Sequence, residues 1–226
     1  MGEMIEFPSN SSQAEGYLAL PDGGSGPGVV VIQEWWGLVP HIKDVCDRFA
    51  REGFVALAPD LYHGRHVSEP DEAAKEMMAL KMDQAGRDMS GALDEVVRRS
   101  GHPDVGVVGF CMGGGLALVL ACQRPDVVAA CVPFYGVIPW PDARPDYGAM
   151  RAAVQGHYAG LDGFFTPEAA RALEGELHSL SKEAEIFVYE GCDHAFFNDT
   201  RPEVYDDAAA RLAWQRTLAF LRRELS

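Results

Sequence analysis

The sequence has no long apolar run and few cationic side chains. No stretch approaches the roughly 20 apolar residues of a membrane-spanning helix, and the N-terminus lacks a basic segment followed by an apolar one. Only 19 Lys and Arg stand against 34 Asp and Glu, which gives a formal net charge of −15. Nucleic-acid binding depends on basic patches that neutralise phosphates. We therefore expect a soluble, cytoplasmic protein with no membrane or nucleic-acid partner.

The patterns of a disulfide framework and of a zinc site are also missing. The cysteines form an odd set without a Cys-x-x-Cys pair: Cys46, Cys111, Cys122, Cys131 and Cys192. Free thiols suit a reducing compartment, and we expect no metal and no cofactor. The 226 residues, 47% of them hydrophobic, predict one domain over residues 1–226 with a single buried core. We expect this domain to be a monomer.

Segments typical of strands and of helices alternate along the chain. Apolar, often β-branched runs predict strands over residues 16–20, 28–32, 54–58, 105–108, 127–134, 152–156 and 186–189. Helical spacing or composition predicts helices over 40–52, 70–100 with a break at Gly86 or Gly91, 116–122, 167–180 and 203–225. Residues 139–147 predict a loop. This alternation predicts an α/β fold with a mostly parallel central sheet and helices on both faces.

One strand leads into a glycine-rich turn, Gly109-Phe110-Cys111-Met112-Gly113-Gly114, and then into an apolar helix. In the Gly-x-Ser-x-Gly turn of α/β-hydrolases the nucleophile lies at a strained backbone position, and flanking side chains would collide with the neighbouring strand and helix. Cys111 stands at the Ser position, above a helix N-terminus that favours a thiolate and an oxyanion. The alternative is a packing turn in which Cys111 is a small buried hydrophobe.

Residues suited to complete a catalytic triad follow Cys111 in the order acid, then histidine. Asp162 and His194 each come after an apolar run that predicts a strand, and α/β-hydrolases use this order. Asp193 is the alternative acid, although a residue adjacent to the histidine on an extended loop usually points elsewhere than the far ring nitrogen. The alternative for His194 is an ordinary loop histidine, which is also the interpretation of His41, His63, His66, His102, His157 and His178.

Six ordered segments carry a resemblance to a known family. They are Gln33-Glu34-Trp35-Trp36-Gly37, Ala58-Pro59-Asp60-Leu61-Tyr62, Gly109 to Gly114, Phe134-Tyr135-Gly136, Asp162, and Gly191-Cys192-Asp193-His194-Ala195-Phe196. The chain resembles the dienelactone hydrolase family, the cysteine branch of the α/β-hydrolases (carboxymethylenebutenolidase-like enzymes). The resemblance implies a carboxylic ester hydrolase that acts on lactones or small activated esters through a Cys-His-Asp triad and a thioester acyl-enzyme.

The resemblance also implies roles for residues around the triad. The backbone amides of Trp35 and Met112 would form the oxyanion hole. Glu34 would raise the pKa of the Cys111 thiol, keep it neutral at rest and take its proton when substrate binds. The alternative for Glu34 is a hydrogen-bonded loop carboxylate.

Substrate binding is expected from a cation and several aromatic side chains. Dienelactone hydrolases hold the substrate carboxylate with two arginines; Arg65 stands in for the first, whereas Asn198 occupies the second position and Arg201 follows three residues later. We therefore expect Arg65 to be the principal anchor. Aromatic loop residues predict an apolar pocket for a small-molecule lactone or ester; they are Trp35, Trp36, Tyr62, Phe165 and Phe197. An esterase or thioesterase with an unrelated substrate, and a non-catalytic binding protein of the same fold, remain alternatives.

Overall fold

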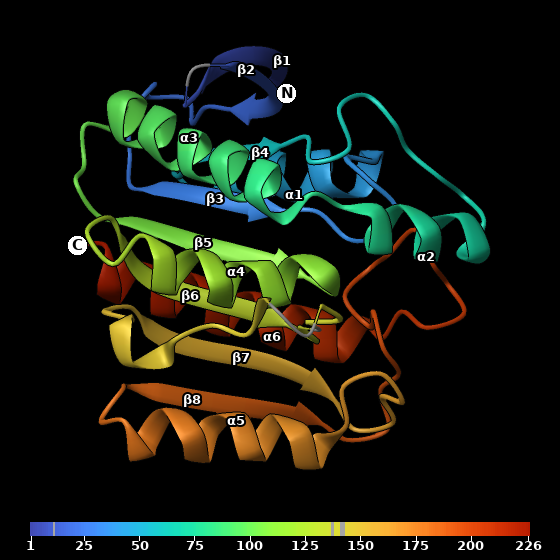
Figure 1. Cartoon of the computed structure of the whole chain (residues 1–226). Coiled ribbons are helices and arrows are strands. Elements are labelled where there is room, and N and C mark those ends of the chain that lie inside the picture. Colours follow the sequence, from blue (N-terminus) through green and yellow to red (C-terminus); the bar gives the residue numbers. More distant parts are fainter. Residues whose placement is uncertain (11, 137, 141–142) are drawn as a thin grey trace.

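An eight-stranded sheet forms the centre of the computed structural model, which describes residues 1–10, 12–136, 138–140 and 143–226 (Figure 1). The strand order is β1-β2-β4-β3-β5-β6-β7-β8. The antiparallel part consists of β1 (Glu3–Ser9), β2 (Ser12–Ala19) and the pairing of β2 with β4 (Val55–Pro59). The parallel part continues through β3 (Gly28–Ile32), β5 (Val105–Phe110), β6 (Val128–Phe134), β7 (Ala153–Ala159) and β8 (Ala184–Tyr189).

Helices cover both faces of this sheet. In Figure 1, α3 (Met82–Ser100), α4 (Met112–Gln123) and α5 (Pro167–Ser179) lie in front, and α1 (Pro40–Arg51) and α6 (Asp207–Glu224) lie behind. The short α2 (Pro70–Ala79) lies beside the carboxyl ends of the strands. The expected mostly parallel α/β fold is thus confirmed. Within the described residues, no helix is long and apolar enough to cross a bilayer.

The core strands are buried because the helices exclude water from both faces. Every residue of β3, β4 and β5 is buried, as expected of parallel strands rich in Val, Ile and Ala. One hydrophobic cluster joins the sheet to α3, α4 and α5, and a second joins it to α1 and α6. The rigid centre holds the loops that leave the carboxyl ends of β3, β5, β7 and β8 at one edge.

Two expectations about local structure were wrong. The N-terminal strand β1 was not predicted, because only Phe7 and Ser9 of its residues are buried and its sequence lacks a clear alternation. The break in the helical region lies at Leu80 and Lys81 rather than at Gly86 or Gly91. Gly91 instead permits close packing, because a Cβ there would lie 2.3 Å from the carbonyl oxygen of Pro8.

Smaller differences concern element ends. The closing helix begins at Asp207 instead of residue 203, because the Asp206 side chain accepts a hydrogen bond from the Ala209 amide and caps the helix there. In the expected loop over residues 139–147, residues 141 and 142 lie outside the described chain, and Tyr147 begins a 3-10 turn, Tyr147–Ala149.

Candidate active site

Cys111 lies in the sharp turn between β5 and α4. Its backbone has φ 55° and ψ −119°, a conformation that costs energy for a residue with a Cβ. The adjacent glycines permit this turn: a Cβ on Gly109 would lie 2.0 Å from the carbonyl oxygen of Gly113, and one on Gly113 would lie 2.4 Å from that of Gln33. Cys111 is partly exposed and lines a cavity, whereas the other four cysteines are buried. The turn therefore presents the thiol to the cavity instead of burying it.

His194 lies between Cys111 and Asp162. Its Nδ1 is 2.7 Å from Oδ2 of Asp162, which is buried in the loop after β7. The other carboxylate oxygen of Asp162 accepts hydrogen bonds from the backbone amides of Phe164 and Phe165, at 2.8 and 3.0 Å. Asp193, the alternative acid, is exposed. The imidazole is therefore oriented by Asp162.

The surroundings of His194 favour the charged imidazolium. Burial lowers its pKa, but hydrogen bonds to Asp162 and Cys111, together with their negative charges, outweigh burial and raise the pKa to about 10. A protonated imidazole, hydrogen-bonded to Asp162, therefore lies next to the Cys111 sulfur.

Two backbone amides near Cys111, those of Trp35 and Met112, have no protein acceptor among the described residues. Met112 is the first residue of α4, so its amide has no acceptor within the helix. The loop after β3 contains Trp35. Across the described chain, neither amide donates a hydrogen bond to a protein acceptor. Both amides are therefore free to donate to a ligand.

Glu34 is buried close to Cys111 but is hydrogen-bonded to a different residue. Its Oε2 accepts a hydrogen bond of 2.8 Å from Nδ2 of Asn198, and both side chains are nearly fully buried. The Asn198 amide is fixed in this orientation because its Oδ1 accepts hydrogen bonds from the backbone and hydroxyl groups of Thr200, at 3.1 and 2.6 Å. Glu34 and Cys111 line the same cavity. Asn198 therefore fixes the Glu34 carboxylate in the wall of the cavity that Cys111 also lines.

The cavity above Cys111 has a volume of about 500 Å³ and largely apolar walls. Its lining residues come from the loops at the carboxyl ends of the strands, from α2 and from the segment before α6; they are Glu34, Trp35, Trp36, Pro70, Met77, Cys111, Leu161, Gly163, Phe164, Asp193, His194, Ala195, Arg201 and Val204. Trp36, one of the expected substrate contacts, is among these lining residues.

Several other predicted substrate contacts are not in this lining. Tyr62 is buried, and its hydroxyl lies 3.6 Å from the sulfur of Met112. Phe197 is stacked on Phe110 in the core, with ring centroids 5.4 Å apart. Phe165 stacks on Tyr158, with centroids 5.0 Å apart. These three aromatic side chains contribute to packing rather than to the cavity wall.

The expected anchor Arg65 also lies elsewhere. Its guanidinium pairs with Glu76 at 3.1 Å, and its side chain is 67% exposed. Arg201 is the cation that lines the cavity. The sequence offered no basis for a role of Arg201, because it lies in an irregular segment before α6 and residue spacing does not tell where such a side chain points.

Phe164 was the main residue that sequence reasoning missed. Its ring lies 5.2 Å from that of His194 and 6.5 Å from that of Trp35, and 70% of the residue is exposed. The adjacent Phe165 turns into the core. The pair Phe164-Phe165 was a visible signal, but the sequence could not tell which ring faces the cavity.

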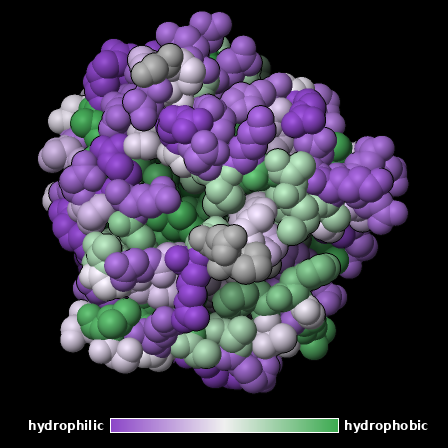
Figure 2. All heavy atoms as spheres, in the orientation of Figure 1, coloured by the Kyte–Doolittle hydropathy of each residue, from purple (hydrophilic) through white to green (hydrophobic). Residues whose placement is uncertain are grey.

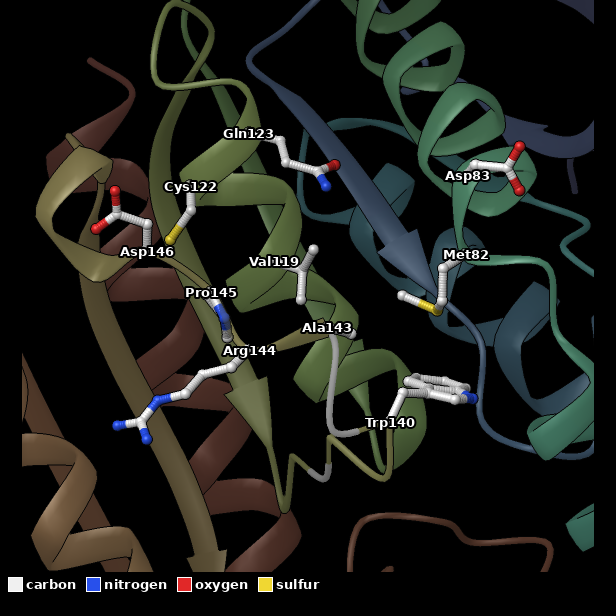
Figure 3. Close-up of a pocket in the computed structure, with 10 residues that line it drawn as sticks. All are labelled: Met82, Asp83, Val119, Cys122, Gln123, Trp140, Ala143, Arg144, Pro145 and Asp146. Atoms are coloured by element: carbon white, nitrogen blue, oxygen red, sulfur yellow. The ribbon is translucent and has the colours of Figure 1, made fainter.

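A second cavity, of about 530 Å³, lies on the α3 and α4 side of the sheet (Figure 3). This face is hydrophilic over the N-terminal hairpin and α3 and more hydrophobic towards its centre (Figure 2). Cys122 and Trp140 line the cavity, but burial and the charge of Asp146 raise the pKa of the Cys122 thiol to about 12. None of the described lining residues is a histidine. This cavity thus lacks an activated nucleophile.

No group of three or more His, Cys, Asp or Glu residues with a metal-site arrangement occurs in the part of the chain that the structure describes. The polar groups of the site instead form a thiol, an imidazole and a carboxylate in series, next to two free amides and a buried glutamate. Such a site on an α/β sheet defines the class of α/β-hydrolase-fold hydrolases.

Comparisons with known proteins identify the family. The sequence model of the dienelactone hydrolase family matches residues 14–225. The chain is 38% identical to Protein usf of Aquifex pyrophilus and 35% identical to a provisionally named carboxymethylenebutenolidase of Aquifex aeolicus, in each case over 100% of both chains. A crystal structure of a provisionally named dienelactone hydrolase from Klebsiella pneumoniae superposes with a TM-score of 0.89 at 28% identity, over 99% of this chain and 98% of that one. The chain belongs to the dienelactone hydrolase family, and the expected assignment to carboxylic ester hydrolases is confirmed at the level of this family.

Proposed function

We propose that the protein hydrolyses lactones or small activated esters, with Cys111 as nucleophile. Cys111 reacts as a thiolate whose proton resides on His194, and Asp162 orients the imidazolium through its Nδ1–H. The thiolate attacks the ester carbonyl carbon, and the amides of Trp35 and Met112 stabilise the tetrahedral oxyanion. His194 then gives its proton to the leaving alkoxide as the C–O bond breaks, which leaves a thioester on Cys111.

The second half of the reaction consumes water. His194 takes a proton from a water molecule, whose oxygen attacks the thioester carbonyl. The tetrahedral intermediate collapses, the C–S bond breaks, and the acid product leaves, so that Cys111 is again a thiolate and His194 keeps the proton taken from water. For a lactone the alcohol and the acid are parts of one product molecule.

The hydrogen-bonded series from Asp162 through His194 to Cys111 is the observation that carries this proposal. A protein that only binds its ligand does not require these three groups in contact at the mouth of a cavity. Glu34, fixed by Asn198, places a negative charge beside the thiol and takes part in control of its proton.

Turnover of p-nitrophenyl acetate tests the proposal. We expect Cys111→Ala to abolish turnover without loss of the far-ultraviolet circular dichroism spectrum, because the Cys111 side chain is partly exposed and adds little packing. Iodoacetamide should inactivate the parent protein in the same way. Residual turnover of the alanine variant above background would require a different nucleophile.

We further propose that the enzyme is a monomer and that it is cytoplasmic, the second of which is consistent with the free thiols. Gel filtration tests whether it is a monomer.

A further inference from the structure

The cavity above Cys111 offers an incoming anion little electrostatic compensation. Two carboxylates line it, the buried Glu34 and the exposed Asp193, and Arg201 is the one arginine or lysine among the described lining residues. The other cationic group, the His194 imidazolium, is already hydrogen-bonded to Asp162 and Cys111. The whole chain adds a formal net charge of −15. A carboxylate on the substrate would therefore enter a region of negative electrostatic potential.

The partner of Glu34 is neutral, so it does not cancel this charge. Glu34 accepts its hydrogen bond from the Asn198 amide, and Thr200 fixes that amide in the donating orientation. No salt bridge joins Glu34 to a cation within the described residues. The cavity wall therefore holds a buried carboxylate that has no salt bridge among the described residues.

Arg201 is already engaged. Its Nε lies 2.8 Å from a carboxylate oxygen of Glu203, and its guanidinium lies 5.9 Å from the ring centroid of Trp36. Glu203 offsets part of the positive charge of this guanidinium and so weakens its attraction for a substrate carboxylate. Arg65, the other nearby candidate, is paired with Glu76 and does not line the cavity.

The walls fit an uncharged group. Trp35, Trp36 and Phe164 form an aromatic side of the cavity, with Trp35 in edge contact with the other two rings at 5.1 and 6.5 Å. Met77 and Val204 add aliphatic and thioether surface. Burial of an apolar substituent against such surfaces is favourable, whereas a carboxylate would lose its hydration there without finding hydrogen-bond donors.

We propose that the natural substrate of this site is an uncharged ester or lactone with an apolar or aromatic substituent, and that carboxylate-bearing esters are excluded. This inference rests on the hydrolytic function proposed above. It differs from the carboxylate anchoring by Arg65 that the sequence suggested.

Two nearly isosteric esters test the proposal: mono-p-nitrophenyl adipate, whose free carboxylate is ionised at pH 7.5, and p-nitrophenyl adipamate, whose terminal group is a neutral amide. We expect kcat/KM of the parent to be at least about tenfold higher for the amide, the loss expected when a charged group is desolvated without a paired partner. Rates measured with Cys111→Ala protein supply the uncatalysed background. An equal or higher kcat/KM for the carboxylate ester would overturn the proposal.

Two matched variants identify the cation that matters. Glu203→Gln releases Arg201 and should raise kcat/KM for the carboxylate ester roughly two- to fivefold, the size of an exposed ion pair. Glu76→Gln releases Arg65 in the same way and should leave the ratio of the two esters unchanged. The amide ester, measured on each variant, reports whether the fold and triad are intact. If Glu76→Gln changed the ratio of the two kcat/KM values more than Glu203→Gln does, Arg65 would be the anchor and the charge assignment would be overturned. If the parent hydrolysed neither ester, the hydrolase function itself would be refuted.

Discussion

Replacement of Asp162 by asparagine should convert His194 to the wrong tautomer. Oδ1 of Asp162 is held by the amides of Phe164 and Phe165, and these donors require an acceptor at that position. The introduced side chain must therefore keep its oxygen there and point its NH₂ group at Nδ1 of His194. Nδ1 then has to be an acceptor, so the ring proton moves to Nε2, the nitrogen that should receive the proton of Cys111.

The expected loss is large. The 2.7 Å hydrogen bond to Asp162 is charge-assisted, worth about 1.5 to 3 kcal/mol, which corresponds to a fall of roughly one to two units in the pKa of His194. The wrong tautomer also removes the base from the chemical step, and in a serine protease the equivalent change lowers kcat about 10⁴-fold. We expect kcat for p-nitrophenyl acetate to fall by about 10³- to 10⁴-fold, with a smaller change in KM.

The matched control is Asp193→Asn, a carboxylate one residue from His194 that is exposed. It should lower kcat less than about threefold, the size expected for an exposed charge. Stopped-flow measurement of p-nitrophenol release on both variants, with circular dichroism as the check on folding, decides the assignment. A loss below tenfold in Asp162→Asn, or equal losses in the two variants, would refute the role given to Asp162.

The remaining predictions concern the resting thiol and a buried histidine. Iodoacetamide should alkylate Cys111 rapidly at about pH 6, below the free-thiol pKa of about 8.5, because His194 favours the ion pair; slow alkylation there would instead support a neutral thiol that substrate activates. Glu34→Gln should lower turnover while alkylation becomes at least as fast, since it removes a repulsive charge; slower alkylation would contradict this. The buried His157, bonded to Tyr189 and Thr217, has its pKa lowered to about 3 by burial and by the charge of Arg216. Between about pH 6.5 and pH 3 this histidine is protonated in the unfolded chain, where its pKa is about 6.5, but neutral in the folded chain. The free energy of unfolding therefore falls as pH drops from about 6.5 towards 3. Urea unfolding should show that the parent loses about 2 kcal/mol more than His157→Gln between pH 7.5 and pH 5, and equal losses would contradict it.

The sequence predicted the centre of the fold well because burial leaves a strong pattern there. β3 is a continuous apolar run and matches its predicted range, residues 28–32. At the edge of the sheet the pattern is weak, and β1 was missed because most of its side chains face solvent. Gly91 was misinterpreted because glycine serves both helix ends and close packing, and only the position of Pro8 separates the two.

At the site, too, some features could be predicted from the sequence and others could not. The proximity of Cys111, Asp162 and His194 could be predicted from their order along the chain, because each follows a strand of the parallel sheet and these strands end at the same edge. The orientations of loop side chains do not follow from order. Phe164 and Phe165 are adjacent and chemically identical, yet one lines the cavity and the other packs on Tyr158.

Helix α2 contributes both to the wall of the cavity and, through Met77, to the packing of the core. Pro70 and Met77 line the cavity, yet Ala73 is the one buried residue of the helix. The carbonyl oxygen of Met77 also accepts a hydrogen bond from the Trp140 indole, at 3.1 Å, which ties the helix to the segment before the 3-10 turn. Pro70 is exposed, whereas Met77 also packs against the core cluster on this face of the sheet. A substitution at Pro70 therefore changes the cavity wall alone, and a substitution at Met77 changes the cavity wall and the core packing together.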